Sequence, residues 1–225
     1  MMSLDLLPAV ELEPDGPARH AVIWLHGLGA DGHDFPPIVP ELRLAPAFAI
    51  RWVFPHAPSI PVTINGGMVM PAWYDIRSPD LGQRPDERGI RLSAARVVRL
   101  IERENERGVP SERIVLAGFS QGGAIAAHVA LRHEVRLAGL VALSTYLVLP
   151  ETLEAERCEV NHELPVFQAH GTFDPMVTLA RGVGSHERLR ALGYEVEWHE
   201  YPMEHQVSTP EIRDLGAWLA RRFEA

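Results

Sequence analysis

The sequence predicts an α/β fold in which a mostly parallel central sheet is covered by helices on both faces. Short apolar runs typical of buried strands alternate along the chain with segments of helical periodicity. This alternation favours a parallel sheet, because the helix that connects two parallel strands packs against the sheet they form. The chain has 225 residues, 46% of them hydrophobic, and shows neither a repeat nor a linker. We therefore expect one domain over residues 1–225.

The expected strands are short runs rich in branched and aromatic residues. They cover residues 21–25, 51–54, 113–117, 140–143, 166–169 and 196–201, the last with the partial alternation of an edge strand. The expected helices cover residues 93–107, 121–132, 176–192 and a final stretch from Pro210. The first helix is the clearest, because its apolar residues follow helical spacing and Gly108 and Pro110 lie beyond its end.

Two connecting segments show little periodicity. Residues 55–91 contain many prolines and glycines, but also large apolar side chains that a disordered tail would lack. We expect this stretch to fold over the functional site. Residues 146–164 are too short for an independent lid, so we expect an open, shallow site with no separate lid domain. Within them, residues 148–163 are left without a predicted element or role.

The composition excludes several classes of function. The formal net charge is −9 and the 21 basic residues are all arginines scattered along the chain, whereas nucleic-acid binding needs clustered positive charge. The absence of lysine excludes a pyridoxal-phosphate Schiff base, a P-loop lysine and a Ser-Lys dyad. Cys158 is the only cysteine, which excludes an intramolecular disulfide and a thiolate metal cluster.

The segment Gly118-Phe119-Ser120-Gln121-Gly122 has the pattern of a nucleophile elbow. It follows an apolar run and precedes an alanine-rich stretch, as expected of a tight turn from a strand into a helix. The strained backbone of such a turn requires residues without side chains two positions before and after the serine, and glycines stand at both places. The pattern alone is weak, because glycine and serine are common in loops. A base, an acid and an oxyanion hole must therefore be found elsewhere.

A glycine-rich turn, His26-Gly27-Leu28-Gly29-Ala30-Asp31-Gly32, follows the first expected strand. A phosphate-binding loop is the competing interpretation, but the spacing fits neither the dinucleotide fingerprint nor the P-loop, which also needs a lysine. We interpret the turn as an oxyanion loop. In this interpretation the backbone N–H of Leu28 approaches a reacting carbonyl oxygen beside the N–H of Gln121.

Two further strand ends supply an acid and a base. Ligands of open parallel sheets bind beyond the carboxyl ends of the strands. Asp174 follows the strand at 166–169, and His205 lies between the last strand and the last helix, which gives the chain order Ser, Asp, His. The structural alternatives are a turn former for Asp174 and a solvated loop histidine for His205. No His-Glu pair of the chain completes an H-E-x-x-H pattern, which argues against a zinc hydrolase.

With these four features in order, the chain resembles the phospholipase/carboxylesterase family of α/β-hydrolases, which includes bacterial carboxylesterases and acyl-protein thioesterases. The resemblance covers nearly the whole chain. It is carried by HGLGADG (26–32), PHAP (55–58), PVT (61–63), MPAWYD (70–75), GFSQGG (118–123), LSTYL (143–147), HGTFD (170–174) and YPMEH (201–205). It implies Ser120 as nucleophile, Asp174 as acid and His205 as base, with the N–H groups of Leu28 and Gln121 as the oxyanion hole.

The chemistry implied is two-step acyl transfer through an acyl-enzyme on Ser120, without a metal or an organic cofactor. Short- to medium-chain carboxylic esters are the first choice of substrate, which makes the chain a carboxylesterase. Acyl-protein thioesters and lysophospholipids are the enzymatic alternatives. A hydrolase-fold module that only binds a ligand is the non-enzymatic alternative, although such proteins usually lack one triad member. Candidate walls of an apolar acyl pocket are Met68, Met70, Trp73, Phe119 and Met176, with core packing as the alternative role for at least half of the candidates.

The remaining expectations concern location and assembly. Neither end carries a basic stretch followed by a long apolar run, and no window approaches eighteen apolar residues. We therefore expect a cytoplasmic protein that is not an integral membrane protein and does not bind nucleic acid. Its partners would be a small ester, an acylated protein or a lysophospholipid, and the family resemblance also allows a homodimer.

Overall fold

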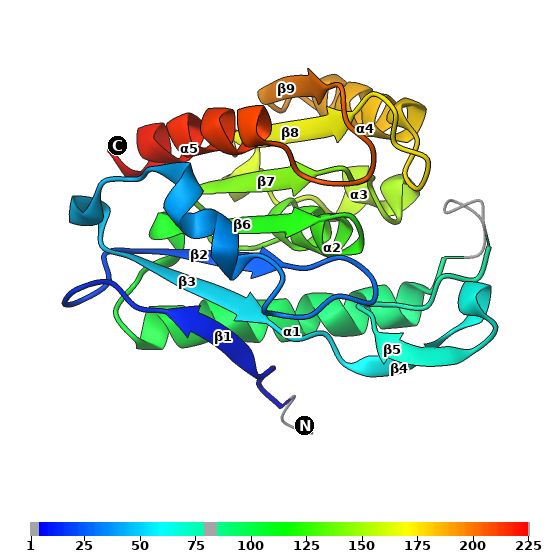
Figure 1. Cartoon of the computed structure of the whole chain (residues 1–225), viewed down its shortest axis with the longest axis horizontal. Helices are drawn as coiled ribbons and strands as arrows, with labels where there is room; N and C mark the ends of the chain where they lie inside the picture. The colour runs from blue at the N-terminus through cyan, green and yellow to red at the C-terminus, as the bar shows by residue number, and fades with distance from the viewer. Residues whose placement is uncertain (1–4, 79–84, 225) are drawn as a thin grey trace.

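A seven-stranded sheet forms the centre of the molecule (Figure 1). In the computed structural model, which describes residues 5–78 and 85–224, the strand order is β1-β3-β2-β6-β7-β8-β9. Only β1 is antiparallel to its neighbour among these strands, so the predicted mostly parallel sheet is confirmed. The strands are β1 (Ala9–Leu12), β2 (His20–Leu25), β3 (Ile50–Pro55), β6 (Ile114–Phe119), β7 (Gly139–Leu143), β8 (Val166–Gly171) and β9 (Val196–Tyr201).

Helices cover both faces of this sheet, which is also as predicted. One face carries α1 (Glu87–Glu106), α2 (Gln121–Ala130), α3 (Pro150–Glu156) and α4 (Leu179–Ala191), and the other carries α5 (Thr209–Phe223) with the 3-10 helix η1 (Pro36–Leu42). Figure 1 shows η1 and α5 on the viewer's side, with α1 and α2 behind the strands. Side chains of a strand alternate between faces, so Ile23 packs with the first group and Trp24 with the second. Short 3-10 helices complete the connections: η2 (Pro46–Phe48), η3 (Thr63–Asn65), η4 (Ser111–Arg113) and η5 (Glu159–Asn161).

Within the segment 55–91, residues 59–71 form a hairpin at the carboxyl ends of the central strands (Figure 1). Its strands are β4 (Ser59–Val62) and β5 (Met68–Pro71), and residues 79–84 of the expected loop lie outside the described part of the chain. The Gly29 N–H donates to the Pro71 carbonyl (2.9 Å), which joins the hairpin to the glycine-rich turn. The expectation that this stretch folds toward the site therefore agrees with its position.

Helices α1 and α4 begin several residues away from their expected starts, each for a local reason. Helix α1 begins at Glu87 rather than at residue 93, because the fully buried Ile90 extends its apolar stripe by a turn. Helix α4 begins at Leu179 rather than at Met176, because the Asp174 carboxylate accepts the N–H groups of residues 176 and 177 and forms a separate turn. The unassigned segment 148–163 contains α3 and η5. Helices among the described residues are too short or too polar to cross a membrane.

Helix α5 begins with a capping box that contains a buried carboxyl group. The Ser208 side chain accepts the Glu211 N–H, and the Glu211 side chain accepts the Ser208 N–H (3.1 Å). Glu211 is 0% exposed, and burial raises the pKa of its carboxyl group to about 8, although the Ser208 hydrogen bond acts in the opposite direction. The folded protein therefore retains a proton on Glu211 at pH values where the unfolded chain has released it.

Because the folded state holds this proton, the free energy of unfolding should fall as the pH rises. Between the ordinary pKa of a glutamate and about 8, the folded state binds one more proton than the unfolded state, so the free energy of unfolding should fall by up to about 1.4 kcal/mol per pH unit from this group. Glu211→Gln should flatten that dependence, because a glutamine stays neutral. Urea unfolding at pH 5.5, 7 and 8.5 measures this pH dependence of the free energy of unfolding. The exposed Glu187→Gln is the control, and equal slopes in the parent and Glu211→Gln would refute the assignment.

Candidate active site

Ser120 lies at the turn between β6 and α2, with φ 53° and ψ −122°. This positive φ is unusual for a residue with a side chain and places the hydroxyl at the apex of a tight turn. The turn has no room for larger neighbours. A Cβ on Gly118 would lie 2.5 Å from the Gly122 carbonyl carbon, and a Cβ on Gly122 would lie 2.3 Å from the Leu25 carbonyl oxygen. The two glycines of the elbow pattern are therefore required by backbone contacts on both sides of the serine.

The structure brings Ser120, His205 and Asp174 into one hydrogen-bonded chain. His205 Nε2 lies 2.8 Å from Ser120 Oγ, and His205 Nδ1 lies 2.6 Å from Asp174 Oδ2. A carboxylate can only accept a hydrogen bond, so the ring proton is on Nδ1 and Nε2 is free to accept the Ser120 proton. This is the arrangement that activates a serine as a nucleophile.

Asp174 is fixed by contacts that leave one oxygen for the histidine. Its Oδ1 accepts the N–H groups of Met176 and Val177, each at 2.8 Å, and the residue is 5% exposed. His170 packs beside it, 3.7 Å from Oδ2, but donates its Nε2–H to the Val177 carbonyl (2.7 Å). Burial lowers the pKa of His170, so this imidazole is a neutral support of the Asp174 turn, as expected of a structural strand-end histidine.

The glycine-rich turn packs directly against the elbow. A Cβ on Gly27 would lie 3.6 Å from the Ser120 Cβ, which shows how closely the two backbones approach. His26 fastens the turn: its Nδ1–H donates to the Gly27 carbonyl (2.7 Å) and its Nε2 accepts the Ala57 N–H (3.0 Å). Burial lowers the pKa of His26, which keeps this tautomer neutral. Within the described residues, the N–H groups of Leu28 and Gln121 have no hydrogen-bond acceptor. Both are thus available to a ligand.

The side chain of Gln121 has a structural role that the sequence did not indicate. Its Oε1 accepts the Trp73 N–H and its Nε2 donates to the Tyr74 carbonyl, both at 2.8 Å. The Trp73 indole N–H in turn donates to the His26 carbonyl (2.9 Å). This buried network joins the elbow, the segment after β5 and the glycine-rich turn. Neither periodicity nor spacing could have revealed it, because the partners lie 47 or more residues apart.

The five candidate pocket residues have different environments. Trp73 is 1% exposed and its indole N–H donates to the His26 carbonyl, which favours core packing, the alternative role, over a place in a pocket wall. Phe119 packs against the His205 ring, with centroids 4.7 Å apart. Met70 approaches Gly29, 3.9 Å from where a Cβ would lie. Met68 and Met176 are 63% and 68% exposed, so neither encloses a pocket.

A cavity of about 350 Å³ lies beside the elbow rather than at Ser120. Its described lining includes Tyr74 and Tyr146, whose hydroxyl groups are 2.7 Å apart, together with Leu147 and the charged residues Arg77 and Arg188. Sequence reasoning did not identify these lining residues, because Tyr74 and Tyr146 come from distant segments and meet only in the folded chain. None of the five candidate pocket residues is among its described lining.

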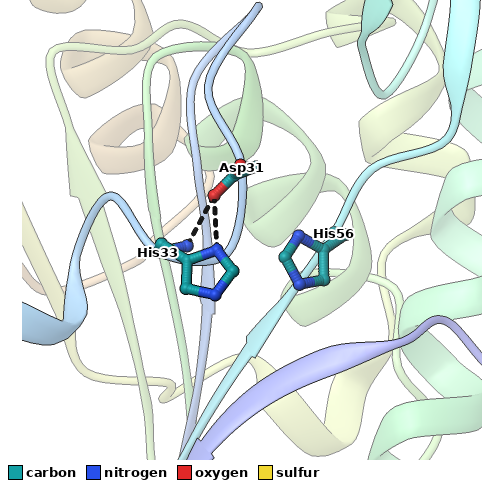
Figure 2. A group of neighbouring side chains, drawn as sticks. All are labelled: Asp31, His33 and His56. Carbon is teal, nitrogen blue, oxygen red and sulfur yellow. Dashed lines mark hydrogen bonds and ion pairs between the residues drawn. The ribbon is translucent and has the colours of Figure 1, made fainter.

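Asp31, His33 and His56 lie close together at the end of the glycine-rich turn (Figure 2). Their side chains are close enough for a cation, but Asp31 Oδ1, His33 Nδ1 and His56 Nδ1 already make hydrogen bonds. Asp31 Oδ1 accepts the backbone N–H of His33 (2.7 Å) and lies 3.0 Å from its Nδ1. His56 Nδ1 accepts the Gly32 N–H (3.1 Å), so the proton of a neutral ring is on Nε2. These contacts stabilise the turn, and we assign no metal site to them.

Comparison with known proteins identifies relatives of this chain. Residues 8–222 match the family model described as phospholipase/carboxylesterase. An acyl-protein thioesterase 1 of Neurospora crassa is 40% identical over 97% of this chain and 91% of its own length. The crystal structure of Arabidopsis thaliana SOBER1 superposes with a TM-score of 0.85 at 31% identity, covering 91% of this chain and 99% of that one. Acyl-protein thioesterase 2 of Zea mays gives 0.82 at 27% identity, covering 96% and 99%.

Proposed function

Because this chain belongs to the phospholipase/carboxylesterase family of α/β-hydrolases, we propose that Ser120, His205 and Asp174 act together as its catalytic triad. The chain is a serine hydrolase acting on ester bonds. One observation carries the assignment of residues: the continuous hydrogen-bonded chain from Ser120 Oγ through both ring nitrogens of His205 to Asp174. The free N–H groups of Leu28 and Gln121 support it, since they provide an oxyanion hole beside the nucleophile.

The reaction follows from this geometry. Ser120 Oγ attacks the acyl carbonyl carbon while His205 Nε2 takes the hydroxyl proton, and the carbonyl oxygen becomes an oxyanion that the two N–H groups stabilise. His205 then gives the proton to the leaving alcohol or thiol, which leaves an acyl-enzyme on Ser120. Water, deprotonated by the same nitrogen, releases the acid and restores the serine. Asp174 keeps the imidazole oriented and stabilises its cationic form.

Thioesters of acylated proteins are the substrates that we propose for this site. A relative with 40% identity over 97% of the chain is an acyl-protein thioesterase, which favours this alternative over the short- to medium-chain carboxylic esters expected first from the sequence. Both substrates present the same acyl carbonyl to Ser120, so ester hydrolysis is compatible with the proposal. Phe173 and Met176, close to Asp174 in the chain, expose large apolar side chains that are available for contact with an acyl chain.

The substrate proposal predicts that an S-acylated peptide is cleaved with a higher kcat/KM than a small oxygen ester of the same acyl chain. The experiment compares S-acyl peptides, small thioesters, p-nitrophenyl esters and lysophosphatidylcholine over acyl chains of increasing length, with Ser120→Ala as the blank. Turnover of small esters without cleavage of the peptide would instead identify a carboxylesterase. A preference for lysophosphatidylcholine would identify a lysophospholipase, and absence of both turnover and fluorophosphonate labelling would identify a binding module.

Three expectations from the sequence belong to this proposal. We propose that residues 1–225 act as a single domain, that the protein works in the cytoplasm, and that two copies form a homodimer. Sedimentation equilibrium measures the last of these directly, and a single species of 25.0 kDa would exclude the dimer.

A further inference from the structure

We propose that Thr145 is a positioning residue of the oxyanion hole, acting through the peptide group that joins Ser120 to Gln121. Thr145 follows β7 and is 3% exposed. Its hydroxyl donates a hydrogen bond of 2.6 Å to the Ser120 carbonyl. The inference rests on the proposed roles of Ser120 and of the Gln121 N–H. It assigns to Thr145 the role of orienting that N–H.

The backbone of Ser120 is held on both sides, by β7 and by the loop that follows it. The Ser120 N–H donates to the Leu143 carbonyl (2.9 Å), and the Ser120 carbonyl receives the Thr145 hydroxyl. The only other described donor to this carbonyl is the Ala124 N–H (3.1 Å), at the first turn of α2. Because φ of Ser120 is positive, its conformation is unfavourable by itself and depends on such contacts.

The same hydrogen bond fixes the direction of the oxyanion donor. In a planar trans peptide the C=O and the N–H point in opposite directions, so a carbonyl held toward Thr145 directs the Gln121 N–H away from it. That N–H has no acceptor among the described residues. A donor on the carbonyl also polarises the peptide and strengthens its N–H as a donor, by about 10–30% per bond. Thr145 therefore both orients and strengthens one of the two proposed oxyanion contacts.

Thr145 has a second contact that the test must separate from the first. A Cβ on Gly123 would lie 2.9 Å from Thr145 Cβ and Cγ2, so the threonine methyl group packs tightly against α2. The hydroxyl and the methyl group can be removed independently. Thr145→Val keeps the shape without the hydrogen bond, Thr145→Ser keeps the hydroxyl without the methyl group, and Thr145→Ala removes both.

Ser144 supplies a matched control. It is fully buried one residue away, and its hydroxyl has no hydrogen-bond partner in the described part of the chain. Ser144→Ala removes a buried hydroxyl from the same loop without touching the Ser120 carbonyl, so its kcat should equal that of the parent.

The experiment measures kcat, KM and the inhibition constant of an alkyl boronic acid, which forms a tetrahedral adduct on serine, for the parent and the four variants. Loss of one oxyanion donor costs roughly 10²- to 10³-fold in kcat, so a misdirected donor should cost about 10-fold. We expect Thr145→Val and Thr145→Ala to lower both kcat and the affinity for the boronic acid by about 10-fold, with KM unchanged. Thr145→Ser should stay close to the parent.

Two outcomes would overturn the inference. Parental kcat in Thr145→Val shows that the hydroxyl is not needed, and a loss in Thr145→Ser equal to that in Thr145→Ala shows that the methyl packing is what matters. If Thr145→Val does not fold, the comparison of Thr145→Ser with Thr145→Ala still decides between them. Failure of the proposed function is distinguishable, because the parent would then lack fluorophosphonate labelling at Ser120, whereas failure of this inference alone leaves that labelling intact.

Discussion

Ser120→Ala should lower kcat for ester and thioester hydrolysis by about 10⁵- to 10⁶-fold, the range expected when the nucleophile of a serine triad is removed. Alanine lacks the Oγ that accepts the acyl group, and His205 then has no proton to take from it. The fold should persist, because the only described hydrogen bond of the Ser120 side chain is the one to His205. A stopped assay with p-nitrophenyl esters and a thermal unfolding scan measure the two effects together.

Ser144→Ala is the natural control for this substitution, since it also removes a hydroxyl from a residue with positive φ at a strand end. Its activity should match that of the parent. If Ser120→Ala retained activity near the parental level with an unchanged melting temperature, the nucleophile would have to be sought elsewhere in the chain.

Asp174→Asn should lower kcat by about 10⁴-fold with little loss of stability. The reason lies in how the two carboxylate oxygens are used. Oδ1 accepts the N–H groups of Met176 and Val177, so an asparagine must place its carbonyl oxygen there and its NH₂ group toward His205. That NH₂ group needs an acceptor, which forces the His205 proton from Nδ1 to Nε2. A protonated Nε2 cannot accept the Ser120 proton.

Steady-state kinetics on thioester and ester substrates measure this effect, and the exposed loop substitution Asp34→Asn serves as the control. Because the mechanism acts through a tautomer, the ¹⁵N chemical shifts of the His205 ring should change between parent and variant. Activity within 10-fold of the parent would mean that Asp174 only forms the turn before α4.

The fold was largely predictable because its signals are local. The strand runs at 21–25 and 196–201 carry their own patterns, and helix ends are marked by glycine and proline. The elements that were missed lack such signals. Strand β1 is a four-residue edge that forms through pairing with β3, and the β4–β5 hairpin has exposed apolar residues such as Met68 and Val69 in place of a clear alternation. Tertiary pairing rather than local propensity determines these strands.

The candidate site also contains residues that could be located from the sequence and contacts that could not. Ser120, Asp174 and His205 could be located from their places after strands, because parallel strands bring their carboxyl ends to one edge of a sheet. The contacts that hold these three residues in place could not be located from the sequence. The Gln121 side chain, His26 and Thr145 act through hydrogen bonds to backbone atoms between 25 and 48 residues away, apart from the His26 bond to its neighbour Gly27. Any residue type presents such backbone atoms, so sequence carries no mark of the partner.

The central claim is that an acyl group passes through Ser120. It is tested most directly by quenching a turnover of the parent protein with an S-acyl peptide in acid and mapping the digested protein by mass spectrometry. We expect the mass of one acyl group on the peptide that contains Ser120, and no such mass in Ser120→Ala. An acyl group on another residue such as Cys158, or turnover with no acylated peptide at any quench time, would contradict it.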